Sequence, residues 1–128
     1  MLYLVKRIAL LGALLHCATF GQADYKCYHP SPTVKGIQKD HCVAAINSFP
    51  VTGDKLVRDD TVFEAKYGTC DVILAVTGNS KTIVTTKSGA LSALDQAFTL
   101  CGGYGTVLIT KKTADESGVE MYTGVPTN

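Results

Sequence analysis

Cys70-Asp-Val-Ile-Leu-Ala-Val-Thr77 sets the fold class, because it is the strongest strand signal in the chain. It is rich in β-branched residues and is followed by Gly78-Asn79, a pair typical of tight turns. Successive side chains of a strand point to opposite faces of a sheet, and here both sets of positions hold apolar residues. We therefore expect the second face, or a sheet edge, to contact another copy of the chain. Cover by a loop of the same chain is the alternative.

The neighbouring segments predict further strands. Residues 62–67 (VFEAKY) precede this strand, and residues 81–86 (KTIVTT) are expected to be its hairpin partner across Gly78-Asn79. Residues 106–112 (TVLITKK) and 119–123 (VEMYT) predict a second hairpin, closed by residues 114–118.

Two helices are predicted from apolar residues that recur at spacings of three and four. The first covers about residues 34–48, ends before Pro50, and carries on one stripe Cys42, Ala45, Ile46 and Phe49. The second covers about residues 89–101 after a Ser88 cap and carries Leu91, Leu94, Phe98 and Cys101. Gly102-Gly103 ends it. The order of elements predicts an α+β fold, an antiparallel sheet of about five strands with two helices packed on it.

The N-terminal residues predict a signal peptide. Lys6 and Arg7 precede the apolar run 8–18, which is too short to span a bilayer. Small residues follow, and cleavage after Gly21 or after Ala23 satisfies the peptidase pattern equally well. A buried N-terminal helix is the alternative. We expect residues 1–23 to be removed, residues 24–128 to form a single disulfide-stapled domain, and the protein to be secreted and extracellular.

Cleavage would remove Cys17 and leave four cysteines, Cys27, Cys42, Cys70 and Cys101, which allow three pairings. In an oxidising compartment we expect two disulfides, each worth about 2–4 kcal/mol. Cys42 and Cys101 both lie on apolar helical stripes, which favours a bridge between the helices and leaves Cys27 to pair with Cys70. Free thiols or a zinc site are the alternatives, but zinc frameworks usually contain close C-x-x-C pairs.

Charge argues against several classes of partner. Removing Lys6 and Arg7 lowers the basic count from 12 to 10, against 11 acidic residues. A nucleic-acid-binding protein needs clustered basic residues, and the pair Lys111-Lys112 is too short for that role. The sequence also contains no amphipathic helix of the membrane-binding kind. We expect a near-neutral target, no nucleic acid and no membrane insertion.

The residues that could perform catalysis are few. His29 and His41 could form an acid–base pair, but Arg58 is the only arginine beyond the leader to stabilise a phosphate. The neighbouring acids Asp59-Asp60 and Asp115-Glu116 lie in expected turns, where they do not encode the separation that a glycosidase requires. We therefore expect no enzymatic activity, no metal and no cofactor.

Tyrosine supplies the remaining functional signal. A tyrosine ring stacks on the C–H face of a sugar while its hydroxyl bonds the rim. Tyr122 alternates with Met121 and is expected on the face opposite the core, together with Glu120 and, if the strands are in register, Asp71. Tyr104 lies in a glycine-rich turn. We take Asp71, Tyr104, Glu120 and Tyr122 as candidate glycan-binding residues. The alternative is that the tyrosines seal the edge of the core.

Three segments carry a resemblance to a known family. They are Cys42-Val-Ala-Ala-Ile46 with Phe49-Pro50, then Tyr67-Gly-Thr-Cys70-Asp-Val-Ile73, then Ser92-Ala-Leu94 with Cys101-Gly-Gly103. In these the chain resembles the small secreted glycan-binding lectins of ink-cap mushrooms over its whole mature length. The resemblance implies an α/β/α sandwich in which the sheets of two protomers join in a homodimer.

The same resemblance implies a function. The expected ligands are cell-surface or viral glycans that contain N-acetylgalactosamine, of the fucosylated LacdiNAc type, bound without catalysis and with antiviral or cytotoxic consequences in fungal defence. It supplies no site residue. The alternative function is that of a small killer-toxin-like or effector protein, which shares a secreted α+β scaffold but acts on a membrane or receptor.

Overall fold

The computed structural model describes residues 25–30, 36–110 and 118–126. The predicted signal peptide, residues 1–23, lies outside the described residues, as does most of the turn predicted at 114–118. The described chain forms an α+β fold in which two helices pack on an antiparallel sheet. This confirms the predicted fold class.

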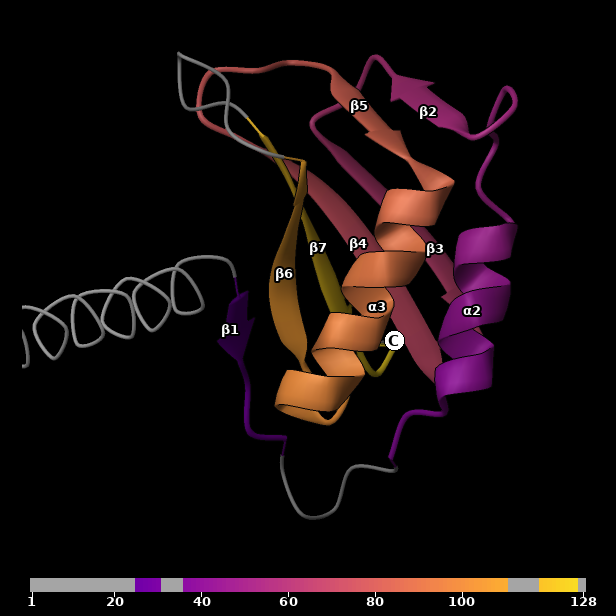
Figure 1. Ribbon diagram of the computed structural model, residues 1–128, viewed down its shortest axis with the longest axis vertical. Coiled ribbons are helices and arrows are strands. Elements are labelled where there is room, and N and C mark those ends of the chain that lie inside the picture. The colour runs from indigo at the N-terminus through magenta and orange to yellow at the C-terminus, as the bar shows by residue number, and fades with distance from the viewer. Residues whose placement is uncertain (1–24, 31–35, 111–117, 127–128) are drawn as a thin grey trace, which may run out of the picture.

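The main sheet has five strands, and every neighbouring pair is antiparallel (Figure 1). In order across the sheet they are β1 (Tyr25–Cys27), β6 (Gly105–Thr110), β7 (Gly118–Gly124), β4 (Cys70–Thr77) and β3 (Val62–Tyr67). The hairpin formed by β6 and β7 therefore lies between β1 and β4. β1 was not expected from the sequence, because three residues carry too little periodicity to identify a strand.

The prediction that residues 81–86 form a hairpin with residues 70–77 is wrong. β5 (Ile83–Thr86) pairs instead with β2 (Lys55–Arg58) in a separate two-stranded sheet. β4 is already bonded on one side to β3 and on the other to β7, so no edge remains for β5. After Gly78 the chain leaves the main sheet and forms the small ribbon seen at the top of Figure 1.

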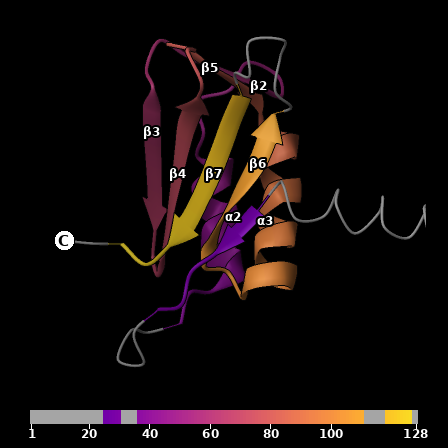
Figure 2. The same ribbon diagram turned by 90° about the vertical axis from the view of Figure 1, so that its left-hand side faces the viewer.

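Both helices, α2 (Lys39–Asn47) and α3 (Lys87–Cys101), lie on the same face of the main sheet (Figures 1 and 2). α2 begins later than predicted, because residues 36–38 are not helical. Thr86, not Ser88, caps α3, since its side chain accepts a hydrogen bond from the backbone N–H of Gly89. Gly102 ends α3 at a φ of +62°, as the glycine pair predicted.

The core lies between the helices and the sheet. α3 faces the sheet mainly through small residues, and Leu91 and Phe98 of the predicted stripe are only partly buried at its flanks. The alanines let the helix approach the strands closely, which a stripe defined by large apolar residues alone does not anticipate. The large, fully buried apolar side chains include Ile46, Leu56, Leu74, Ile83, Leu94, Met121, Val72 and Val107.

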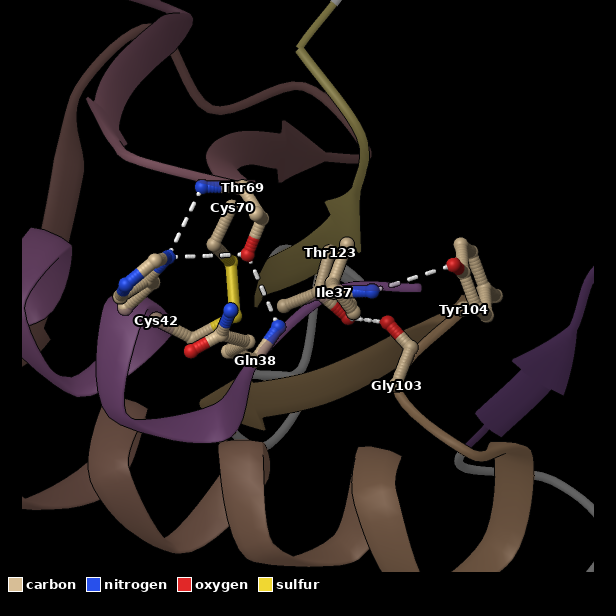
Figure 3. Close-up of a disulfide and its surroundings, with 9 residues drawn as sticks. Ile37, Gln38, Cys42, Thr69, Cys70, Gly103, Tyr104 and Thr123 are labelled. Atoms are coloured by element: carbon tan, nitrogen blue, oxygen red, sulfur yellow. Dashed lines mark hydrogen bonds between the residues drawn. A yellow bond between two sulfur atoms is a disulfide. The ribbon is translucent and has the colours of Figure 1, made fainter. Parts of the chain in front are cut away.

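The disulfide pairing differs from the expected one. Cys27 is bonded to Cys101, and Cys42 is bonded to Cys70, so the predicted Cys42–Cys101 and Cys27–Cys70 bridges do not form. Cys42 and Cys101 both face the sheet, as predicted, but each is bonded to a cysteine of a strand and not to the other helix. The first bridge ties α3 to β1, and the second ties α2 to the start of β4 (Figure 3). Each helix is therefore stapled to the sheet.

Candidate functional site

The face of the main sheet that points away from the helices, here called the open face, is defined by the strand register. Val72, Leu74 and Met121 point toward the helices and are fully buried, so the alternate residues point the other way. Cross-strand pairing sets these residues in three rows. The rows are Lys26–Thr106–Tyr122–Ile73–Glu64, then Leu108–Glu120–Ala75–Val62, then Gly124–Asp71–Lys66.

Two shallow hollows adjoin on this side of the molecule. The first, the sheet hollow, has a volume of about 350 Å³ and is lined by Tyr28, Ile73, Ala75, Thr106, Glu120 and Tyr122. The second, the loop hollow, has a volume of about 420 Å³ and is lined by Tyr28, His29, Pro30, Tyr104, Tyr122 and Val125. Tyr28 and Tyr122 line both hollows, so the two hollows adjoin at this pair of side chains.

The two shared tyrosines are held in place by strand pairing and by each other. Their rings meet edge to face, with centroids 5.4 Å apart. The hydroxyl of Tyr28 shares a hydrogen bond of 2.8 Å with Oγ1 of Thr106, and the backbone N–H of Tyr28 donates to the carbonyl of Tyr104 at 2.8 Å. Tyr28 still remains 40% exposed. The pair therefore offers aromatic surface to solvent from fixed positions.

The position of Tyr122 depends on Gly124, two residues farther along β7. A Cβ placed on Gly124 would lie 2.6 Å from the hydroxyl oxygen of Tyr122. This distance is shorter than a van der Waals contact, so the ring would have to move. The absence of a side chain at residue 124 thus leaves room for the end of the Tyr122 ring.

Tyr104, which lines the loop hollow, is held by a separate contact. Its hydroxyl accepts a hydrogen bond of 3.2 Å from the backbone N–H of Ile37 (Figure 3).

The structure brings three of the four sequence candidates together. Glu120 and Tyr122 line the sheet hollow, and Tyr104 and Tyr122 line the loop hollow. Asp71 lies on the same face but is only 3% exposed and lines neither hollow. Tyr28, which lines both, was missed. Its signal lay in alternation, because a disulfide at Cys27 turns that side chain toward the core and its neighbours outward.

Asp71 is the electrostatic anomaly of the open face. Burial is the main cause that raises its pKa from 3.8 to about 7, and a hydrogen bond and like charge from Glu64 add to it, while Lys66 opposes the shift. Glu64 lies diagonally across the β3–β4 pair, and Lys66 lies directly opposite. The Oδ1 atom of Asp71 has no hydrogen-bond partner among the described residues. The carboxyl is therefore poised to hold a proton near neutral pH.

His41, considered above for acid–base chemistry, has a structural role. Its Nδ1 accepts a hydrogen bond of 2.9 Å from the backbone N–H of Thr69, and Oγ1 of Thr69 accepts one of 2.9 Å from the N–H of Gln38 (Figure 3). The ring covers Gly68, where a Cβ would overlap it and where φ is +52°. These contacts fasten the β3–β4 turn to the start of α2 beside the Cys42–Cys70 bridge.

The described residues contain neither a metal-binding cluster nor a membrane-spanning helix. Within residues 25–30, 36–110 and 118–126, His, Cys, Asp and Glu side chains form no group of three or more that could hold a metal ion. In the same part of the chain, no helix combines the length and the apolar character needed to cross a membrane.

The comparisons with known proteins add no identification. No protein-family model matches the chain, and no curated protein and no solved structure matches it significantly.

Proposed function

We propose that the protein is a secreted, non-catalytic glycan-binding protein whose site is the joined sheet and loop hollows. The observation that carries this proposal is the Tyr28–Tyr122 pair, which lines both hollows from fixed positions. Aromatic rings that line an open hollow favour ligands with flat C–H surfaces and hydroxyl rims, as sugars have. Thr106 and Glu120 add polar groups that fix the orientation of a ligand.

The shape of the site favours an oligosaccharide over a single sugar. Each hollow, at about 350 and 420 Å³, lies near the lower end of the range for small-molecule sites. Because both share the tyrosine pair, adjacent sugar units would occupy adjacent hollows. In keeping with the family resemblance, we propose N-acetylgalactosamine-containing glycans of the fucosylated LacdiNAc type, on cells or viruses, as the ligands.

A homodimer would strengthen binding through avidity. β3 is an edge strand of the main sheet, and its Val62 side chain is 56% exposed. Pairing of two β3 edges would join the sheets of two protomers and leave both tyrosine sites open. Two linked sites raise the apparent affinity for a multivalent surface without any new contact. This is how a weak, shallow site would support antiviral or cytotoxic defence.

Secretion is the proposed localisation. The structure forms two disulfides, and such bridges persist in oxidising compartments. A domain of this size commonly depends on such bridges for its stability.

A glycan array tests the proposed function. The oxidised mature protein is expected to bind a restricted set of oligosaccharides, and Tyr28→Ala is expected to abolish the signal. Tyr67→Ala is the matched control, because Tyr67 is a 55% exposed tyrosine that lines neither hollow. A blank array at high protein concentration contradicts the proposal. Cell killing that persists in excess free sugar would favour the toxin alternative.

A further inference from the structure

The two hollows differ in charge. The sheet hollow contains the carboxylate of Glu120, whereas none of the residues that line the loop hollow is acidic. Glu120 lies in the middle of the open face, directly between Leu108 of β6 and Ala75 of β4. Its carboxylate is thus set among apolar neighbours near the centre of the sheet.

Glu120 also has no cationic partner among the described residues. Within the described parts of the chain, the ion pairs join Lys39 to Asp95, Arg58 to Asp60, and Lys66 to Glu64. Glu120 takes part in none of them, although it is half-buried. A partly desolvated carboxylate without a counter-charge attracts a cation and repels an anion more strongly than one in open water.

The tyrosines reinforce this preference. The faces of aromatic rings attract ammonium groups, and Tyr28 and Tyr122 line the same hollow as Glu120. Thr106 holds the Tyr28 hydroxyl at 2.8 Å, so the ring does not have to be ordered when a ligand arrives. Carboxylate and rings together match a sugar that carries a protonated amino group.

We infer that Glu120 makes the sheet hollow selective for a free amino sugar, while the loop hollow accepts a neutral unit. Within the proposed glycans, the N-acetylgalactosamine unit then occupies the loop hollow, and the sheet hollow favours a form of the neighbouring unit whose amino group is not acetylated. Acidic sugars are disfavoured in the sheet hollow. This inference rests on the proposed function, because the tyrosine pair must hold the sugar ring for its substituent to reach Glu120.

Nuclear magnetic resonance titrations with galactosamine and with N-acetylgalactosamine test the inference, at about pH 6, where an amino group is protonated. The two sugars differ only in the charge and acetylation of one nitrogen. The wild-type protein is expected to bind galactosamine roughly threefold to tenfold more tightly, with the largest shifts at Glu120, Tyr28 and Tyr122. In Glu120→Gln this preference should disappear.

Glu64→Gln is the matched control, because Glu64 is a carboxylate on the same face that lines neither hollow. It should keep the wild-type preference. Equal binding of both sugars by the wild type, or an unchanged preference in Glu120→Gln, overturns the inference. If the array shows bound glycans and this preference is missing, the inference alone fails. If neither the array nor the titrations show binding, the proposed function fails with it.

Discussion

The two faces of the main sheet are built from the same strands but follow different rules. On the helix side, Leu74, Val72 and Met121 are fully buried, and both disulfides tie helices to strands. On the open side, the neighbouring residues Ile73 and Ala75 line a hollow, and Asp71 is buried with an unpaired oxygen. One face is packed and covalently fixed, and the other retains polar groups without partners.

This difference separates stability from binding within single strands. Unpaired polar groups and shallow hollows lower the stability of a fold, so their collection on one face points to a role other than packing. Because side chains alternate along a strand, substitutions at two adjacent residues compare the two faces of the sheet at one place in the same protein. The following experiments do so, from the largest expected effect to the smallest.

Removal of a disulfide should have the largest effect. Replacing Cys27 and Cys101 by alanine opens a bridge between residues 74 apart and should lower the free energy of unfolding by about 4.5 kcal/mol. Replacing Cys42 and Cys70, which are 28 apart, should cost slightly less, about 3.5 kcal/mol. Urea unfolding followed by circular dichroism measures both.

The same pair of variants also distinguishes the faces. Tyr28 directly follows Cys27, so loss of the first bridge should also weaken glycan binding, whereas loss of the second should leave binding intact in the folded protein. Unchanged binding after loss of the first bridge would show that the open face does not depend on how β1 is held.

Truncation of two adjacent β4 residues compares the faces directly. Leu74→Ala removes a fully buried side chain under the helices and should destabilise the protein by about 2–5 kcal/mol. Ile73→Ala removes a half-exposed side chain from the sheet hollow and should cost no more than about 1.5 kcal/mol. Thermal unfolding of both variants measures the difference. Similar losses would mean that the open face is covered in solution.

Asp71 should make stability depend on pH. Its pKa of about 7 in the folded protein lies above the ordinary 3.8, so the folded state binds this proton more tightly. The stabilisation is complete below about pH 4, declines as pH rises toward 7, and is absent above that. Each unit of pKa shift corresponds to about 1.4 kcal/mol, so the total is at most about 4 kcal/mol.

Asp71→Asn isolates this effect. The variant should be more stable than the wild type at about pH 8, and its unfolding free energy should change less between pH 4 and 8. Ile73→Ala, which removes no titratable group from the same face, is the control and should keep the wild-type slope over this range. A wild-type slope in Asp71→Asn would place the titrating group elsewhere. Urea midpoints across this pH range provide the measurement.

Gly124→Ala should have the smallest effect on stability and a clear effect on the site. The added Cβ would displace the end of the Tyr122 ring, a side chain that can move, so unfolding should change by less than about 1 kcal/mol. Glycan affinity and the Tyr122 ring resonances should both change. Gly36→Ala, where an added Cβ meets nothing within 4 Å, is the control. Unchanged affinity would show that the ring position is not important for binding.

Local pattern predicted the elements, and competition between distant segments decided how they pair. The β4 strand and the α3 helix could be recognised because their periodicity is written in consecutive residues. The partner of β5 could not, because the answer depended on β3 and β7 already occupying both edges of β4. The prediction of the cysteine pairing failed for a similar reason. A helical stripe gives the direction of a cysteine side chain but not the strand that it contacts.

The site residues also divide into those that the local pattern predicts and those that depend on pairing between distant segments. The alternation of Glu120 and Tyr122 placed both on the open face, and the strand register brings both to one hollow. Tyr28 joins them only because β1 pairs with the free edge of β6, a contact between segments far apart in the sequence. Asp71 was correctly placed on the face, but its burial depends on neighbours that a single strand does not reveal.

The central position of the β6–β7 hairpin has a consequence for how the chain folds. β1, near the beginning, can pair only with β6, and β4 lacks a neighbour on one side until β7 has been made. Pairing of such distant segments is slow, since long loops must close before contacts form. The sheet therefore cannot be completed on a partly synthesised chain. Under the proposed secretion, a chain that stays open until β7 has been made would cross the membrane unfolded and form its two bridges afterwards.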